Sequence, residues 1–283
     1  MENQCQWHRP PSVAGSFYSK LKEDLNSDLD KMMAHVKTSG PIDQMIAIIV
    51  PHAGYMYSGL VAANAYSHLR DKSYETVVML GVNHRLAGFQ GISIFESGQY
   101  ETPLGNLKID DQLAKSIKKE NLAFVFNKEA HQNEHSLEVQ VPFIQKVLPG
   151  VKLLPIILSD YSKSTCCKLA KILEKVLDVD KHLLLASTDL SHFHQYDDAI
   201  KLDQKAIDSI QSLDPEDLYR KYESQKTELC GYGPVLTTLY YAKSKKGSRT
   251  TLCDYKNSGD VTGDHSQVVG YVSAIISMDG SDD

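Results

Sequence analysis

Four short, continuous apolar runs alternate with helical patterns along the chain. They are MIAIIV (45–50), TVVMLGV (76–82), KLLPIIL (152–158) and HLLLAST (182–188). Apolar runs of this length are typical of strands buried on both faces, as in parallel sheets that helices cover. A strand–helix–strand crossover onto such a sheet is almost always right-handed. We therefore predict an α/β fold in which a central, mostly parallel sheet is flanked by helices.

Apolar spacing along the rest of the chain predicts the other elements. It predicts helices over residues 20–36, 60–69, 109–120, 136–148, 164–177, 197–211, 215–223 and 235–245. Further strands are expected over residues 91–97, 249–255 and 267–277. Pro142 lies within a predicted helix, and Pro155 lies within a predicted strand, where proline is typical of a sheet edge or a bulge. Because no internal repeat or linker-like segment divides the chain, residues 1–283 are predicted to form a single domain.

The composition excludes several classes of protein. The chain has 283 residues, of which 42% are hydrophobic and 23% are charged, and this excludes an intrinsically disordered chain. A net charge of −6 lacks the basic footprint of broad nucleic-acid binding. The longest apolar stretch, Met45–Val50, is too short to span a bilayer, and the polar N-terminus lacks the apolar core of a signal peptide. We expect a cytoplasmic protein that binds neither nucleic acid nor membrane.

The cysteines are typical of a protein from a reducing compartment, because their number is odd and no pair has CxxC spacing. They are Cys5, Cys166, Cys167, Cys230 and Cys253. Cys230 stands apart, since it lies among the glycines of LCGYGP (229–234), just before a predicted helix. A thiol near a helix N-terminus is expected to have a lowered pKa and to act as a metal ligand or a nucleophile.

Three histidines follow apolar strands directly. His52 follows the run 45–50, His84 follows the run 76–82, and His192 follows the run that ends at residue 188. The carboxyl ends of parallel strands line the crevice where ligands bind, so these imidazoles converge if the strands are neighbours. A single histidine in such a place more often hydrogen-bonds within its loop, but three at equivalent positions favour a shared role. Neutral imidazole suits iron, copper, nickel and zinc, and a metal site is therefore predicted.

Carboxylates lie near these histidines in the sequence. Asp189 is in the same predicted loop as His192. Glu134 and His135 open a predicted helix, with Glu138 one turn further on. These residues are candidates for a fourth ligand, a general base or groups that orient the imidazoles.

Several motifs recur in the order and separation of a known family. The chain opens with PPSVAGSFY (10–18), and then contains VPHAGYMYSG (50–59), LGVNH (80–84), ETPLGN (101–106), EHSLEVQVPF (134–143), STDLSH (187–192), LCGYGP (229–234) and SGDVTGD (258–264). Together they resemble the Memo family, also called AmmeMemoRadiSam system protein B, which includes homologues of the mediator of ErbB2-driven cell motility. The resemblance covers nearly the whole chain.

This resemblance implies a fold related to the class III extradiol dioxygenases, with a pocket of the non-haem iron type. It also implies a site built from His52, His84, His192 and Cys230, with Asp189 alongside. Groups expected beside these ligands are Glu134, His135 and Tyr55. The third position is a histidine or a cysteine, where ring-cleaving enzymes use a carboxylate.

The first functional hypothesis is metal-dependent redox or oxygenase-like activity on a small-molecule substrate. His52, His84 and Cys230 would bind iron or copper, with zinc as a further option. His192 would be another ligand or an acid/base group, and Asp189 would orient it.

Two other hypotheses use the same pocket. One is a non-catalytic binding or adaptor module that takes a phosphopeptide or a partner protein. The other is a hydrolase in which Cys230 is the nucleophile, His192 the base and Asp189 the orienting group. The resemblance further implies partnership with an AMMECR1-like protein and a radical SAM protein.

Overall fold

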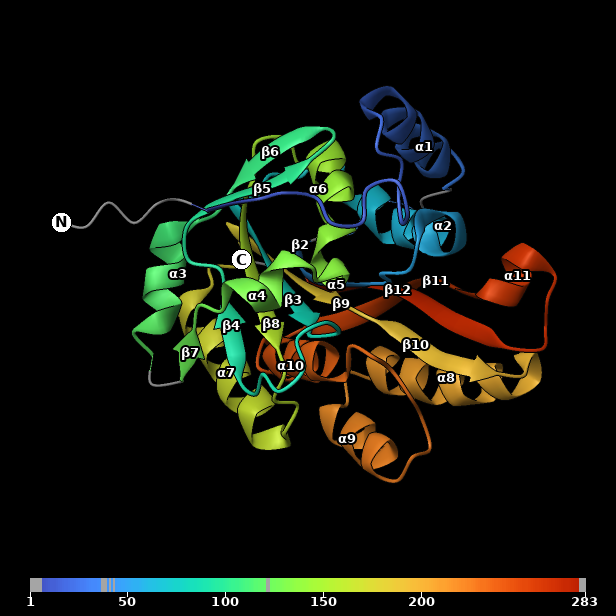
Figure 1. Ribbon diagram of the computed structural model, residues 1–283. Coiled ribbons are helices and arrows are strands. Elements are labelled where there is room, and N and C mark those ends of the chain that lie inside the picture. The colour runs from blue at the N-terminus through green and yellow to red at the C-terminus, as the bar shows by residue number, and fades with distance from the viewer. Residues whose placement is uncertain (1–6, 37–39, 41, 43, 121–122, 280–283) are drawn as a thin grey trace.

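A mixed β-sheet runs through the centre of the molecule (Figure 1). The computed structural model describes residues 7–36, 40, 42, 44–120 and 123–279. Within them, nine strands form this sheet: β2 (Gln44–Val50), β3 (Thr76–Val82), β4 (Ile92–Ile94), β7 (Phe124–Val125), β8 (Lys152–Leu158), β9 (His182–Ser187), β10 (Asp189–His194), β11 (Ser248–Asn257) and β12 (Val268–Met278). Their order is β10–β12–β2–β9–β3–β8–β4–β7, and β11 pairs with β12.

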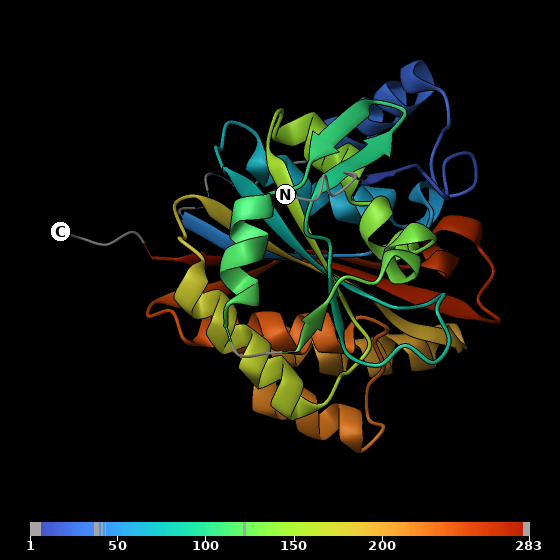
Figure 2. The ribbon, with the colours of Figure 1, turned by 60° about the vertical axis from the view of Figure 1, so that its left-hand side comes forward.

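Helices cover both faces of the sheet (Figures 1 and 2). One face packs against α1 (Lys22–Ala34), α2 (Tyr55–Tyr66), α5 (His135–Glu138), α6 (Val141–Val147) and a small sheet of β1 (Trp7–Arg9), β5 (Gly98–Thr102) and β6 (Gly105–Lys108). The other face packs against α3 (Asp111–Lys118), α7 (Lys163–Val176), α8 (Tyr196–Gln211), α9 (Pro215–Glu223) and α10 (Tyr232–Lys243). Shorter helices are η1 (Ser67–Leu69), α4 (Lys128–Gln132) and α11 (Ser258–Thr262). Each face has its own apolar core, because successive side chains of a strand point to opposite faces.

The predicted α/β fold is confirmed. The four continuous apolar runs are β2, β3, β8 and β9, which form the parallel centre of the sheet and are buried along almost their whole length. The flanks are antiparallel, since β12 joins β2 and β4 joins β8, so the sheet as a whole is mixed. Among the described helices, none combines the length and the apolar content that a bilayer span requires. Cys5 lies outside the described residues.

Pro155 is not at an edge or a bulge, so that prediction is wrong. Its strand β8 lies inside the sheet, between β3 and β4, and pairs in unbroken register with β3 through Met79 and Pro155. The carbonyl of Pro155 accepts a hydrogen bond from Phe95 N at 3.0 Å, on the side of β4. The nitrogen and the carbonyl of one strand residue point to the same neighbour. The missing N–H therefore faces the end of β4, beside Phe95, the residue after the last strand pair of Ile94 and Ile156.

The helix predicted over residues 136–148 is two short helices. Helix α5 ends at Glu138 and α6 begins at Val141, with Pro142 in the first turn of α6. Proline is tolerated there because the first N–H groups of a helix make no intrahelical bond. The break leaves the segment that carries His135 as one isolated turn of helix.

Candidate metal centre

The carboxyl ends of β2, β9 and β3 meet at one edge of the sheet, because these strands are adjacent in the order β2–β9–β3. His52 lies two residues after β2, and His84 lies two residues after β3. Their ring centroids are 5.2 Å apart, with the rings nearly perpendicular. The expected convergence of these two imidazoles is confirmed.

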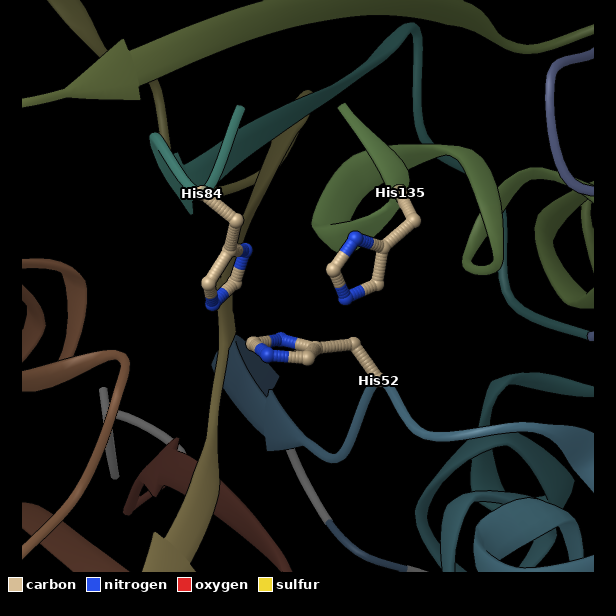
Figure 3. A group of neighbouring side chains, drawn as sticks. All are labelled: His52, His84 and His135. Atoms are coloured by element: carbon tan, nitrogen blue, oxygen red, sulfur yellow. The ribbon is translucent and has the colours of Figure 1, made fainter. Parts of the chain in front are cut away.

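A third imidazole, that of His135, completes the cluster (Figure 3). Its ring centroid lies 4.6 Å from that of His84 and 5.5 Å from that of His52. Each of the three side chains offers one nitrogen, and these nitrogens all lie within 4.8 Å of one another. The His52, His84 and His135 cluster can therefore hold a metal ion. The sequence placed His135 only beside the ligands.

A glycine in β3 allows His135 to come so close. A Cβ atom on Gly81 would lie 2.6 Å from the side chain of Leu137 and 2.8 Å from Ser136 Oγ, both on α5. Glycine is the residue that permits such close approach of backbone segments. The signal for it is present in LGVNH, where a glycine interrupts an otherwise apolar strand.

Glu134 determines which nitrogen of His84 faces the cluster. One carboxylate oxygen accepts from His84 N at 2.6 Å, and the other lies 2.9 Å from His84 Nδ1. Burial alone would raise the pKa of Glu134, but the hydrogen bond and charge of His84 lower it to about 2, so the group is an anion that only accepts. Nδ1 of His84 must donate, so Nε2 is the nitrogen that can face a metal. A carboxylate behind a histidine ligand is the usual arrangement in metal sites.

A serine fixes the ring of His52 in the tautomer that carries its hydrogen on Nδ1. Its side chain is buried, and Nδ1 lies 2.9 Å from Ser187 Oγ. Because the Ser187 hydroxyl donates its own hydrogen to the carbonyl of Ser136 at 2.6 Å, its oxygen accepts from His52 Nδ1. Burial, assisted by the charge of His84, lowers the pKa of His52 to about 3, so the ring is neutral. Its Nε2 lone pair is directed toward Cys230 Sγ, 3.1 Å away.

Cys230 lies beside this nitrogen because the chain around it is closely packed. A Cβ atom on Gly231 would overlap the carbonyl of Ser187 and the side chain of Thr188, so the first glycine of CGYGP allows α10 to begin against the end of β9. The amide of Asp189 donates to the sulfur at 3.2 Å. The expected lowering of the thiol pKa is wrong, because burial, together with the charge of Asp189, raises it.

Asp189 and His192 were expected to share a loop, but both lie on strand β10. Asp189 is buried, and its Oδ1 accepts from the backbone amide of His52 at 2.7 Å. Asp189 therefore holds the backbone of the loop that follows β2. Nδ1 of His192 donates to the carbonyl of Leu190 at 2.8 Å, which leaves Nε2 free of this bond. His192 lies outside the group of three whose nitrogens are within 4.8 Å of one another.

The structure pairs the thiol with a different histidine from the one the hydrolase hypothesis needs. The imidazole that contacts Cys230 is that of His52. No hydrogen bond joins Cys230 to His192 in the part of the chain that the structure describes, so the expected nucleophile–base pair is not formed. Tyr55 begins α2, three residues after His52, and its hydroxyl donates to the carbonyl of Val139 at 2.7 Å.

The residues present fit a transition metal. Nδ1 of His135 is buried and makes no hydrogen bond among the described residues, with Glu134 Oε1 3.5 Å away, and burial lowers the pKa of this histidine to about 4. The three imidazoles form a donor set that suits iron, copper and zinc, and the Cys230 thiol, outside this group of three, lies 3.1 Å from one of them. Carbonyl and carboxylate oxygens, which calcium and magnesium prefer, are used here to orient the imidazoles instead.

Comparison with known proteins identifies the family. A family model described as Memo-like protein matches residues 9–275. The chain belongs to the Memo family. A MEMO1 family protein of Sulfolobus acidocaldarius is 38% identical over 279 residues, which covers 94% of this chain and 98% of the relative. MEMO1 family proteins of Sulfurisphaera tokodaii and Methanobrevibacter smithii are 36% and 34% identical, with 94% of this chain covered in each case and 98% and 99% of the relatives.

The family match covers every segment that contributes to the cluster of this Memo chain. The motif EHSLEVQVPF supplies both Glu134 and His135, which the sequence predicted as supporting groups. Only the fold shows that His135 belongs to the same cluster as His52 and His84, because its position depends on the contact between α5 and Gly81.

Proposed function

We propose that this Memo-family chain binds a redox-active transition metal, iron or copper, and uses it in redox or oxygenase-like chemistry on a small molecule. His52 and His84 would hold the metal through Nε2. His135, which is within the cluster, and Cys230, which contacts His52, would complete a set of three nitrogens and one sulfur. The observation that carries the proposal is the cluster itself, in which three imidazole nitrogens lie within 4.8 Å of one another and a thiol lies 3.1 Å from one of them.

Each neighbouring residue has a separate task in this proposal. Glu134 and Ser187 hold the Nδ1 atoms of His84 and His52, which keeps both Nε2 atoms directed at the metal position and makes them better donors. Asp189 fixes the backbone of His52. When bound, the metal would supply one-electron redox chemistry and Lewis acidity. Nε2 of His192, the nitrogen that the bond to Leu190 does not use, would accept a proton from a substrate beside the cluster.

A surface cavity one side chain away from the cluster is consistent with a small-molecule substrate. Its volume is about 740 Å³, within the range of ligand pockets, and its lining includes Phe17, Tyr55 and Met56. The ring centroids of Phe17 and His135 are 4.9 Å apart, so Phe17 connects the cavity to the cluster, whose three histidines are not among the lining residues.

Metal analysis of protein purified without oxygen tests the proposal. We expect about one iron or copper per chain in the wild type, and loss of most of it in His52→Ala and Cys230→Ser, since each removes a ligand. His194→Ala is a matched control, because His194 lies on β10 but pairs with Glu228 and should leave the metal content unchanged. Full metal retention in both His52→Ala and Cys230→Ser would refute the proposal.

A phosphopeptide titration separates this function from the adaptor alternative. Binding of a phosphotyrosine peptide that persists after chelation of the metal would favour an adaptor module. Oxygen consumption with catechol-like compounds, lost after chelation, would favour the redox enzyme.

The family resemblance also leads us to propose a cytoplasmic location and association with an AMMECR1-like protein and a radical SAM protein. Co-purification of these proteins from cells that express all three is the test.

A further inference from the structure

An arginine–glutamate pair is completely buried behind the histidine cluster. Arg9 ends β1, Glu138 ends α5, and neither side chain is exposed. Arg9 Nη1 donates to Glu138 Oε2 at 2.8 Å, across 129 positions of sequence. A buried ion pair is weak evidence for stability, because removing two charges from water costs about as much as their attraction returns. Its other contacts must explain its presence.

The remaining donors of Arg9 bind the backbone of the segment that carries the cluster. Nε donates to the carbonyl of His131 at 2.7 Å, and Nη2 donates to the carbonyl of Glu134 at 2.8 Å. The Glu134 carbonyl belongs to the peptide bond that joins Glu134 to His135. One guanidinium thus holds the peptide between the carboxylate that orients His84 and the third imidazole.

Glu138 is held in turn by the N-terminal segment. Its carboxylate accepts from the amides of Ser12 and Val13 and from the hydroxyls of Ser12 and Tyr18, the last two at 2.6 and 2.7 Å. These donors, with the charge of Arg9, outweigh burial and lower the pKa of Glu138. The motif PPSVAGSFY, which contributes none of the proposed ligands, therefore closes around this carboxylate.

His135 depends on such backbone contacts more than the other two imidazoles do. The rings of His52 and His84 are held at Nδ1 by hydrogen bonds of 2.9 Å, whereas Nδ1 of His135 makes no hydrogen bond among the described residues and has only Glu134 Oε1 at 3.5 Å. Its helix α5 has four residues, too few to be stable without tertiary contacts. Phe17, from the same N-terminal segment, packs on the ring.

We propose that Arg9 and Glu138 are positioning residues for the metal centre, which hold the Glu134–His135 peptide so that both side chains face the metal. This inference rests on the proposed function, because it assumes that the cluster binds a metal. It predicts that a change in the buried pair alters the geometry and the affinity of the centre, although neither residue contacts the metal.

Co²⁺ binding, followed by visible absorption, tests the inference in Arg9→Lys and Glu138→Gln. Lysine keeps the charge but loses the fork that reaches two carbonyls and a carboxylate, and glutamine keeps the shape but loses the charge. We expect about tenfold weaker Co²⁺ binding, the lower end of the effect of groups that orient ligands, together with a changed Co²⁺ spectrum. Asp110→Asn is the matched stability control. Asp110 is also a buried carboxylate that accepts from a hydroxyl and a backbone amide, those of Thr76 and Leu113, but at the start of α3. It should leave affinity and spectrum unchanged.

Repeating Arg9→Lys in a His135→Ala background separates positioning from general destabilisation. Arg9→Lys should reduce Co²⁺ affinity by a smaller factor in the His135→Ala background than in the wild type. An equal reduction in both backgrounds would overturn the inference. Should Arg9→Lys and Glu138→Gln fail to fold, Tyr18→Phe removes one donor to Glu138 and should still change the spectrum; an unchanged spectrum would count against the inference. A wild type that binds no metal refutes the proposed function. Unchanged affinity and spectrum in folded Arg9→Lys and Glu138→Gln refute the positioning role alone.

Discussion

Substitution of Gly81 by alanine should weaken metal binding, because it pushes α5, which carries His135, away from β3. The added Cβ would lie 2.6 Å from Leu137 Cγ and Cδ2 and 2.8 Å from Ser136 Oγ, where ordinary contacts between carbon atoms are about 3.5–4.0 Å. Helix α5 must therefore move by about 1 Å, and His135 moves with it. Overpacking of a closed core costs about 1–3 kcal/mol, and we expect the free energy of unfolding to fall by that amount.

Urea unfolding of Gly81→Ala, Leu137→Ala and the double variant measures this effect. Leu137 is buried, and its truncation alone should cost about 2–5 kcal/mol. The double variant should lose less than the sum of the two, because the shorter side chain makes room for the new methyl group. Gly59→Ala is the matched control, since its Cβ would meet the flexible end of Met32 and alanine is favoured within a helix by about 1 kcal/mol.

The urea midpoint should therefore fall in Gly81→Ala and stay the same or rise in Gly59→Ala, with unchanged slopes. Co²⁺ affinity should fall only in Gly81→Ala. A wild-type midpoint in Gly81→Ala, or strictly additive losses in the double variant, would refute the reasoning that Gly81 sets the position of α5.

Three further predictions follow from buried carboxylates. Glu134→Gln should weaken Co²⁺ binding by about 10–100-fold, since the anion that orients an imidazole is lost, and unchanged affinity in a Co²⁺ titration would contradict this role. The pKa of Glu138 lies below its ordinary value of 4.5, because Arg9 and the hydrogen bonds outweigh burial. Its stabilisation is therefore complete above about pH 4.5 and is lost as the pH falls through the lowered pKa. Near neutral pH, Glu138→Gln should lower the free energy of unfolding by about 3–5 kcal/mol. That free energy, measured by urea unfolding, should also decline less on acidification than in the wild type. Equal declines in the two proteins would exclude this linkage. Gly270→Ala should lower the free energy of unfolding by about 1–3 kcal/mol, since its Cβ would overlap the buried Asp203 carboxylate; an unaltered urea midpoint would show that α8 can move aside.

The sequence alone was sufficient for the parallel centre of the sheet and for two members of the cluster. Short continuous apolar runs are typical of strands covered on both faces, so β2, β3, β8 and β9 followed from local pattern. A residue just past such a strand must lie at the carboxyl edge of the sheet, and this placed His52 and His84 correctly. Pairing of Glu134 with an imidazole was also among the predicted roles, and its partner proved to be His84.

Only the tertiary structure decided which other groups join them. His135 enters the cluster because Gly81 allows α5 against β3, and His192 remains outside the group of three because β10 pairs with β12. Pro155 is tolerated inside the sheet because the neighbouring ladder stops beside it, and the pKa of Cys230 is raised because burial outweighs its place near a helix terminus. Each of these outcomes depends on contacts between segments far apart in sequence. Local periodicity specifies which face of an element is buried, but not which neighbour covers it.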